Sequence, residues 1–169
     1  MSDIRFHTLF LCTGNSARSI MAETILNSLG SDRFIGYSAG SSPEGEVRPE
    51  VLQLLERMQL PTEGLRSKSW DEFTTDDAPS MDFIITVCDR AAAEPCPVWP
   101  GVPMTAHWGI PDPASVEGPE RERIQAYRDA FFALQKRIRL FLNLPFASLD
   151  RMRLQQRLDQ IGRDGDSDA

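Results

Sequence analysis

Long hydrophobic runs are missing from this chain, and so is any excess of positive charge. No apolar stretch approaches the roughly 20 residues that span a bilayer, so we expect no membrane association. The formal net charge of -7 argues against nucleic acid or an anionic membrane as a partner. It also means that a negatively charged substrate needs positive potential supplied locally. The first residues lack the apolar core of a signal peptide, which predicts a cytoplasmic protein.

Cysteine is scarce as well, with three residues in 169. An odd number does not build a framework of structural disulfides, and cysteines in the cytoplasm are expected to rest as thiols. Three cysteines do suit a relay in which two pair while one is free. The remaining composition, with 41% hydrophobic and 25% charged residues, is typical of one globular domain with a substantial core.

Apolar runs alternate with amphipathic stretches, which is typical of an α/β protein with a parallel sheet. The pattern predicts four strands, at residues 6–11, 34–39, 83–87 and 104–108. Helices are expected at residues 19–29, 49–58 and 120–142, with a short helix starting near residue 69. We therefore predict a single α/β domain whose four-stranded parallel sheet has helices on both faces.

The C-terminal part of the chain differs in composition. We assign residues 1–146 to the domain and residues 147–169 to a tail that is partly helical and then disordered. The tail helix is expected to begin at a Ser148 cap and to end at Gly162. Its apolar face is predicted to consist of Leu149, Met152, Leu158 and Ile161.

The most informative stretch runs from Cys12 to Ser19 and reads Cys12-Thr13-Gly14-Asn15-Ser16-Ala17-Arg18-Ser19. A strand that turns into a helix through small residues cradles an oxyanion in backbone N–H groups, and the helix N-terminus adds its positive end. Arg18 supplies a planar, charged fork. We expect Cys12, at the floor of this cup, to have a lowered pKa and to act as a thiolate nucleophile.

Chance also produces a cysteine and an arginine at this spacing, and a buried cysteine is usually inert. The flanking strand and helix favour the functional interpretation. So do Gly14 and Asn15, because glycine and asparagine tolerate the left-handed backbone that a tight anion loop requires.

Cys88 follows the third predicted strand. Because the carboxyl ends of parallel strands share one edge, Cys88 and Cys12 are expected on the same rim. Cys96 lies in a small-residue segment flanked by Pro95 and Pro97, which we expect to be mobile and without regular structure. The alternative is two unrelated cysteines, one in the core and one in a loop.

The loop resembles that of the low-molecular-weight tyrosine phosphatase superfamily, which includes arsenate reductases of the same fold. The similarity covers roughly residues 5 to 142, and the other cysteines point to the reductases. The resemblance implies that Cys12 attacks arsenate and that Cys88 then attacks Cys12, releasing arsenite. Cys96 would take over the disulfide and present it to thioredoxin, a thiol–disulfide exchange.

The same resemblance assigns a general acid. Asp112 precedes Pro113 in a stretch similar to the superfamily's acid motif and would protonate the leaving oxygen. An Asp-Pro pair otherwise merely starts a turn. Nearby His107 is expected to be structural.

A potassium site beside the loop is a further implication. Asn15, Glu23, Ser38 and Asp71 match the positions that bind this ion in some related reductases. Alternatively, Asn15 shapes the loop, Ser38 bonds to it and the two carboxylates are solvated. Apart from this ion and an external thiol reductant, no cofactor is expected.

Two other functions compete with arsenate reduction. A tyrosine phosphatase would use the same loop and acid, but Ala114-Ser115-Val116 stands where the phosphatases carry a tyrosine pair. A regulator that binds arsenic through three thiols would need neither Arg18 nor Asp112. We expect a monomer that binds arsenate, with phosphate or sulfate as analogues. The gap between Cys88 and Cys96 leaves glutaredoxin with glutathione as an alternative to thioredoxin.

Overall fold

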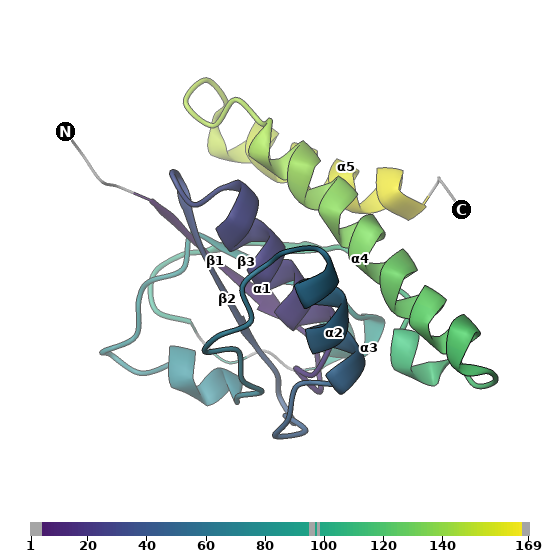
Figure 1. Cartoon of the computed structure of the whole chain (residues 1–169). Helices are drawn as coiled ribbons and strands as arrows, with labels where there is room; N and C mark the ends of the chain where they lie inside the picture. The colour runs from purple at the N-terminus through teal and green to yellow at the C-terminus, as the bar shows by residue number, and fades with distance from the viewer. Residues whose placement is uncertain (1–4, 95–96, 98, 167–169) are drawn as a thin grey trace.

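The computed structural model describes residues 5–94, 97 and 99–166 (Figure 1). The predicted strands and long helices are confirmed, each ending within a residue of its expected bounds. In chain order the elements are β1 (Phe6–Leu11), α1 (Arg18–Leu29), β2 (Phe34–Ala39), α2 (Pro49–Arg57), η1 (Trp70–Phe73), β3 (Phe83–Thr86), α3 (Asp89–Ala93), β4 (Met104–His107), η2 (Pro113–Ser115), α4 (Glu120–Leu142) and α5 (Arg151–Asp166). The η elements are single turns of 3-10 helix.

The four strands form one parallel sheet in the order β2-β1-β3-β4, as predicted. The chain moves from β1 to β2 on one side and then to β3 on the other, so the strand order reverses between β1 and β3. Ligands of doubly wound sheets bind at this reversal, beyond the carboxyl ends of the strands. The register aligns Leu11 with Thr86 and Thr86 with His107. Cys12 and Cys88 therefore follow their strands at the same edge.

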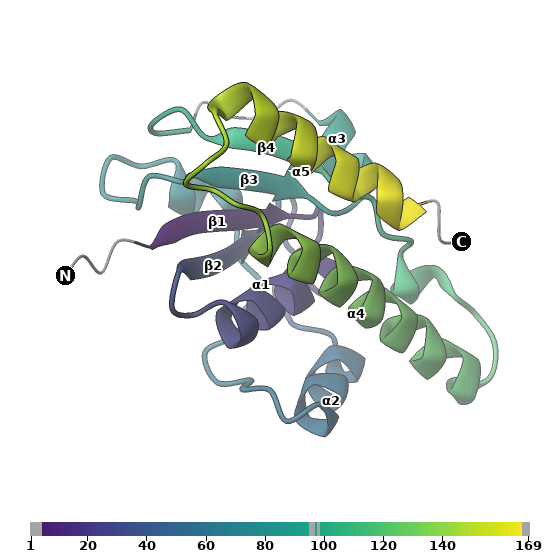
Figure 2. The same cartoon turned by 90° about the horizontal axis from the view of Figure 1, so that it is seen from above.

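Both faces of the sheet are buried, which explains why the strands read as nearly continuous apolar runs. On one face Phe10 and Ile85 belong to the main core, which α1, α4 and α5 cover. Figure 2 shows α4 beside α1, and α5 on the side of β3 and β4. On the other face Leu9 and Ile84 join a smaller cluster with Phe73 of η1. The predicted helical cover of this second face is thus a single 3-10 turn with its flanking loops.

One segment has more regular structure than predicted. Residues 89–93, for which no helix was predicted, form the short helix α3. Its cap is Cys88, whose Sγ accepts a hydrogen bond from the Ala91 N–H at 3.4 Å. The alanine-rich run precedes Pro95, so neither proline interrupts this turn. The predicted mobility of the segment stays a prediction, and Cys96 lies outside the described residues.

The tail helix differs from its prediction in three respects. It is capped by Asp150, whose Oδ1 accepts a hydrogen bond from the Arg153 N–H at 2.8 Å, rather than by Ser148. Met152 is 74% exposed, and Leu154 takes its place in the core. Gly162 does not end the helix, which continues to Asp166. A Cβ at Gly162 would overlap the carbonyl oxygen at the end of β4, so this glycine serves close packing.

This helix shares the core of the domain. Leu158 is fully buried, and its carbonyl oxygen accepts a hydrogen bond from the indole Nε1 of buried Trp108 at 3.1 Å. Ile161 packs in the same cluster. The division at residue 146 stays a prediction about domain boundaries. Within the described part of the chain, no helix has the length and apolarity needed to cross a membrane.

We predict that Leu158→Ala lowers the free energy of unfolding by about 2–4 kcal/mol, because it leaves a cavity between α5 and the core. Met152→Ala, on the exposed side of the same helix, should change it by less than about 0.5 kcal/mol. Urea unfolding of both variants measures the difference. Equal stability of the two variants would contradict the docking of α5.

Candidate functional site

The segment from Cys12 to Ala17 links β1 to α1 at the carboxyl edge of the sheet. The carbonyl oxygens of Thr13, Gly14 and Ser16 accept hydrogen bonds from backbone N–H groups of residues 42–48, at 3.0, 2.9 and 3.0 Å. In a trans peptide the carbonyl and the following N–H point in opposite directions. The N–H groups that follow these carbonyls therefore point away from these contacts, which leaves them available to an oxyanion.

The start of α1 completes this cradle. Ala17 occupies the cap position and offers no side-chain cap hydrogen bond, so the first-turn N–H groups are not satisfied by a capping side chain. Such a helix start favours a bound anion. The loop also needs room behind it, because a Cβ at Gly40 would overlap the carbonyl oxygens of Cys12 and Thr13. Gly40 was not singled out by its sequence, since its role depends on a contact between distant segments.

Asn15 is one of two non-glycine residues with positive φ among those described, at 43°. Its side chain is fully buried, and both the nitrogen and the oxygen of the side-chain amide form hydrogen bonds that stabilise this conformation. Nδ2 donates to Ser19 Oγ at 2.8 Å, and Oδ1 accepts from the Lys68 N–H at 2.8 Å. The predicted role of Asn15 in shaping the loop agrees with this geometry.

Cys12 and Cys88, 76 residues apart in sequence, lie side by side in the folded chain. Both thiols are buried and free, and both line the same pocket. Cys88 Sγ also accepts hydrogen bonds from the Thr13 N–H and the Ala91 N–H, each at 3.4 Å. The juxtaposition brings Cys12 and Cys88 to one site, as the shared sheet edge predicted. The alternative that Cys88 and Cys96 are unrelated stays open, because Cys96 lies outside the described residues.

The two thiols titrate as a pair. The hydrogen bond from Cys12 lowers the pKa of Cys88 to about 5, and the Thr13 and Ala91 N–H groups add to this effect. The same bond and burial raise the pKa of Cys12, against the opposing charge of Arg18. The pair therefore releases one proton at low pH and holds the other. The predicted low pKa of Cys12 alone is wrong for the ligand-free site, because the prediction did not place a second thiol within hydrogen-bonding distance.

Arg18 and Asp112 face each other across the pocket. Arg18 Nη1 donates to the Ile110 carbonyl oxygen at 2.8 Å, and Nη2 lies 3.7 Å from Asp112 Oδ1. The Asp112 carboxylate also accepts a hydrogen bond from the Ala114 N–H at 2.9 Å, which caps η2. Asp112 thus both starts a turn and faces the arginine, so the two interpretations of its Asp-Pro pair are compatible.

These residues surround a cavity of about 490 Å³. Arg18, Arg48 and Arg90 bring positive charge to its wall, and the carboxylates of Glu44, Asp89 and Asp112 lie on the same wall. The described residues that line the cavity are Cys12, Thr13, Gly14, Ser16, Ala17, Arg18, Ser42, Glu44, Arg48, Cys88, Asp89, Arg90, Ile110, Pro111, Asp112 and Ala114. None of these residues is aromatic. The cavity therefore suits a small oxyanion better than a phenyl ester.

Two links to α3, one from the anion loop and one from β4, were missed at the sequence level. Thr13 Oγ1 donates to Glu94 Oε1 at 2.6 Å, which ties the end of α3 to the anion loop. Asp89 Oδ1 lies 2.8 Å from His107 Nε2, which ties the start of α3 to β4. His107 has the structural role that was expected. No sequence motif marks Glu94, because its partner lies 81 positions earlier.

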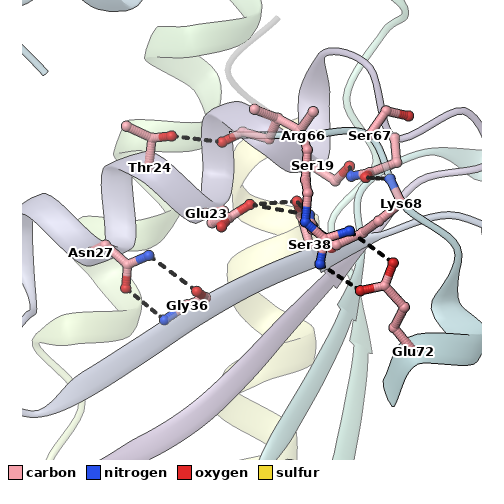
Figure 3. Close-up of polar contacts among 12 residues, drawn as sticks. Ser19, Glu23, Thr24, Asn27, Gly36, Ser38, Arg66, Ser67, Lys68 and Glu72 are labelled. Carbon is pink, nitrogen blue, oxygen red and sulfur yellow. Dashed lines mark hydrogen bonds and ion pairs between the residues drawn. The ribbon is translucent and has the colours of Figure 1, made fainter. Parts of the chain in front are cut away.

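Two of the predicted potassium ligands, Glu23 and Ser38, contact each other behind the loop (Figure 3). Asn15 joins them through Lys68, whose N–H donates to its Oδ1. Ser38 Oγ donates to Glu23 Oε1 at 2.5 Å. Lys68, which the sequence did not suggest, contacts the same groups. Asp71 is exposed. The potassium ion itself stays a prediction.

Comparison with known proteins places the chain in a family. Residues 7–154 match the family model described as low molecular weight phosphotyrosine protein phosphatase. The chain belongs to this family. The match covers the sheet, the anion loop and the acid segment.

Within the family, the curated relatives include arsenate reductases. Those of Shouchella clausii and Halalkalibacterium halodurans are 33% and 34% identical over 132 residues, 78% of this chain and 91% of each relative. Among solved structures, an arsenate reductase from Archaeoglobus fulgidus has a TM-score of 0.64 at 28% identity, over 81% of this chain and 99% of that one. A thioredoxin-dependent arsenate reductase from Corynebacterium glutamicum has a TM-score of 0.57 at 26% identity, over 83% of this chain and 65% of that one.

We predict that replacing either thiol shifts the pKa of the other, in opposite directions. In a Cys96→Ala background, thiolate absorbance near 240 nm should rise with a midpoint of about 5 as the pair loses its first proton. Cys12→Ala should raise that midpoint, because Cys88 loses the hydrogen bond that most lowers its pKa. Cys88→Ala should lower the pKa of Cys12, since Arg18 and the Gly14 N–H still stabilise its thiolate. Identical titrations in all three proteins would exclude coupling.

Proposed function

We propose that this protein is an arsenate reductase that forms a Cys12–arsenate adduct and reduces it through an internal disulfide. The observation that carries the proposal is the position of Cys88 on the oxyanion pocket that Cys12 also lines, with its Sγ accepting a hydrogen bond from the N–H of Thr13, the residue after Cys12. Phosphoester hydrolysis needs only the nucleophile, the arginine and the acid. A second thiol in contact with the first gives the site a route to two-electron chemistry.

The first step is nucleophilic attack on arsenic. The Cys12 proton passes along the hydrogen bond to Cys88, and the Cys12 sulfur forms a bond to As(V) while an As–O bond breaks. Asp112, protonated at that moment, gives its proton to the departing oxygen, which leaves as water. Arg18 and the loop N–H groups hold the remaining oxygens.

The second step is the reduction. Cys88, protonated in the first step, gives its proton to the Asp112 carboxylate, which lines the same pocket. The resulting thiolate, favoured by the Thr13 and Ala91 N–H groups, attacks the Cys12 sulfur. A bond forms between the two sulfurs as the S–As bond breaks, and its electron pair goes to arsenic, which leaves as arsenite. The two thiols are oxidised to a disulfide, and arsenic is reduced from As(V) to As(III). Cys96 then attacks Cys88 and frees Cys12.

An external dithiol must reduce the final disulfide. We propose thioredoxin as this donor, on the strength of the thioredoxin-dependent reductase among the structural relatives. Glutaredoxin with glutathione is the alternative, and it would leave a mixed disulfide with glutathione on one cysteine.

Tyrosine phosphatase activity is the second candidate. The family model and the shared fold of the T. tengcongensis phosphatase, with a TM-score of 0.62 at 20% identity, favour it. The wall of the cavity argues against it, because none of the described lining residues is aromatic.

Arsenate turnover tests the proposal. With thioredoxin, thioredoxin reductase and NADPH, arsenate should drive NADPH oxidation in the wild type and not in Cys12→Ser. Cys88→Ser should lose this activity but keep slow hydrolysis of p-nitrophenyl phosphate, since hydrolysis requires no second thiol. Efficient hydrolysis by the wild type with no arsenate-dependent oxidation would reverse the choice between the two functions.

Mass spectrometry separates the steps of the relay. After arsenate treatment without reductant, the wild type should hold a Cys88–Cys96 disulfide, whereas Cys96→Ser should stop at Cys12–Cys88. A glutathione adduct in place of either disulfide, with glutathione present, would assign the donor to glutaredoxin.

Arg18→Lys should lower kcat/KM for arsenate by about 10²–10³-fold, the usual cost of removing one well-placed donor from an oxyanion site. An ammonium cannot supply a bidentate fork. Arg139→Lys, at an exposed position of α4, is the matched control and should retain activity. Near-normal turnover of Arg18→Lys would refute its role as oxyanion clamp.

A further inference from the structure

An ammonium group is buried behind the anion loop. Lys68 is 8% exposed, and its Nζ donates to the Ser38 carbonyl oxygen at 2.8 Å and to Ser38 Oγ at 3.3 Å (Figure 3). Glu23 Oε1 lies 3.8 Å from the same nitrogen. Long lysine side chains usually keep their charge in water. Lys68 points into the protein instead, where its ammonium contacts a carbonyl, a hydroxyl and a carboxylate. These contacts hold it there.

The other end of Lys68 contacts the anion loop. Its backbone N–H donates to Asn15 Oδ1, the bond that helps to hold Asn15 in its left-handed conformation. The preceding residue adds a second link, because Ser67 Oγ donates to the Gly14 carbonyl oxygen at 3.3 Å. The side chain of Lys68 contacts β2 and α1. Its backbone and the neighbouring Ser67 contact Asn15 and Gly14 of the anion loop.

The segment around Lys68 is fixed on both sides. The backbone of Lys68 accepts a hydrogen bond from the Gly40 N–H at 3.0 Å, at the end of β2. Arg66 forms a two-pronged ion pair with Glu72, at 2.8 and 2.5 Å, across the turn that contains Lys68. The backbone N–H that meets Asn15 is therefore held in place when Nζ is anchored.

Charge gives Lys68 a second effect on the loop. Glu23 projects from α1, the helix whose start faces the oxyanion, and its side chain is only 18% exposed. An uncompensated carboxylate behind the loop would oppose a bound anion, and at this depth it would be poorly screened. The Lys68 ammonium offsets that charge. Burial raises the pKa of Glu23 and lowers that of Lys68, and each charge opposes the other's shift.

The residues present do not fit an alkali cation. Asn15 Oδ1 accepts the Lys68 backbone N–H, and the oxygens of Ser38 face its Nζ. A potassium ion among these oxygens would lie against the ammonium and be repelled by like charge. Asp71, the fourth predicted ligand, is exposed, and its carboxylate is not among the groups in contact with Nζ.

We propose that Lys68 is a built-in monovalent cation that positions the anion loop, so that oxyanion binding by this chain is independent of potassium. The proposal rests on the loop being the oxyanion site of the proposed function. It makes Lys68 a positioning residue, acting through Asn15 and Glu23 without touching the substrate.

The test measures oxyanion affinity rather than arsenate turnover. Calorimetric titration with inorganic phosphate is run in choline, sodium, potassium and methylammonium chloride at equal ionic strength. The wild type should bind phosphate equally in all four salts. Lys68→Ala should bind at least tenfold more weakly in choline and regain affinity when potassium or methylammonium enters the vacated space. Lys136→Ala, which removes the only other lysine from an exposed position, should match the wild type.

Each alternative result overturns the proposal. Phosphate binding by the wild type that strengthens with potassium would mean that the ion, not Lys68, has this role. If Lys68→Ala binds phosphate weakly in every salt, the lysine is needed for packing and not for its charge. If Lys68→Ala binds phosphate as tightly as the wild type, Lys68 has no role in oxyanion binding. If Lys68→Ala does not fold, Lys68→Met keeps the stem without the charge, and its phosphate affinity should still fall at least tenfold. Because phosphate binding needs no reduction step, failure here is distinct from failure of arsenate turnover.

Discussion

Parallel pairing of β1 with β3 is the constraint on which the site depends. The register places Leu11 opposite Thr86, and the Val87 N–H continues the ladder onto the Leu11 carbonyl oxygen at 2.9 Å. A cysteine follows this last pair on each chain segment: Cys12 comes after Leu11, and Cys88 comes after Val87. A parallel slip of one residue would also exchange the two faces of a strand, moving its core side chains to the wrong side. The buried alternation of Phe10 against Leu9 and Leu11 therefore enforces the distance between the two sulfurs.

A loop built to hold anions must also be stable before any anion arrives. Here the carbonyl groups are satisfied from outside by residues 42–48, and the left-handed Asn15 is held by its own amide. Because the pKa of Cys12 is raised and that of Cys88 is lowered, the two thiols together carry one negative charge rather than two. Polar groups behind the loop thus limit reorganisation when a ligand binds, which is the condition under which fixed dipoles are most effective.

The sequence was sufficient for the fold and for the residues with strong local patterns. Phe6–Leu11 and Glu120–Leu142 were predicted at their observed bounds, because apolar period and flanking residues determine them. Arg18 and Asp112 were found through motifs around them. The sequence did not reveal Lys68 or Glu94, whose roles depend on partners 53 and 81 positions away. For the same reason it gave the wrong ionisation for Cys12, since a pKa depends on neighbours in space.

The glycine on α5 has a cost as well as a use. Gly162 lets the backbone of the helix lie against the end of β4, where a side chain would overlap the carbonyl oxygen of His107. In an isolated helix the same residue is unfavourable by about 1 kcal/mol relative to alanine. A 16-residue segment with such a residue is a marginal helix in water. Its helical order is therefore acquired together with its contact to Trp108, so that folding of the last helix and docking onto the sheet are one event.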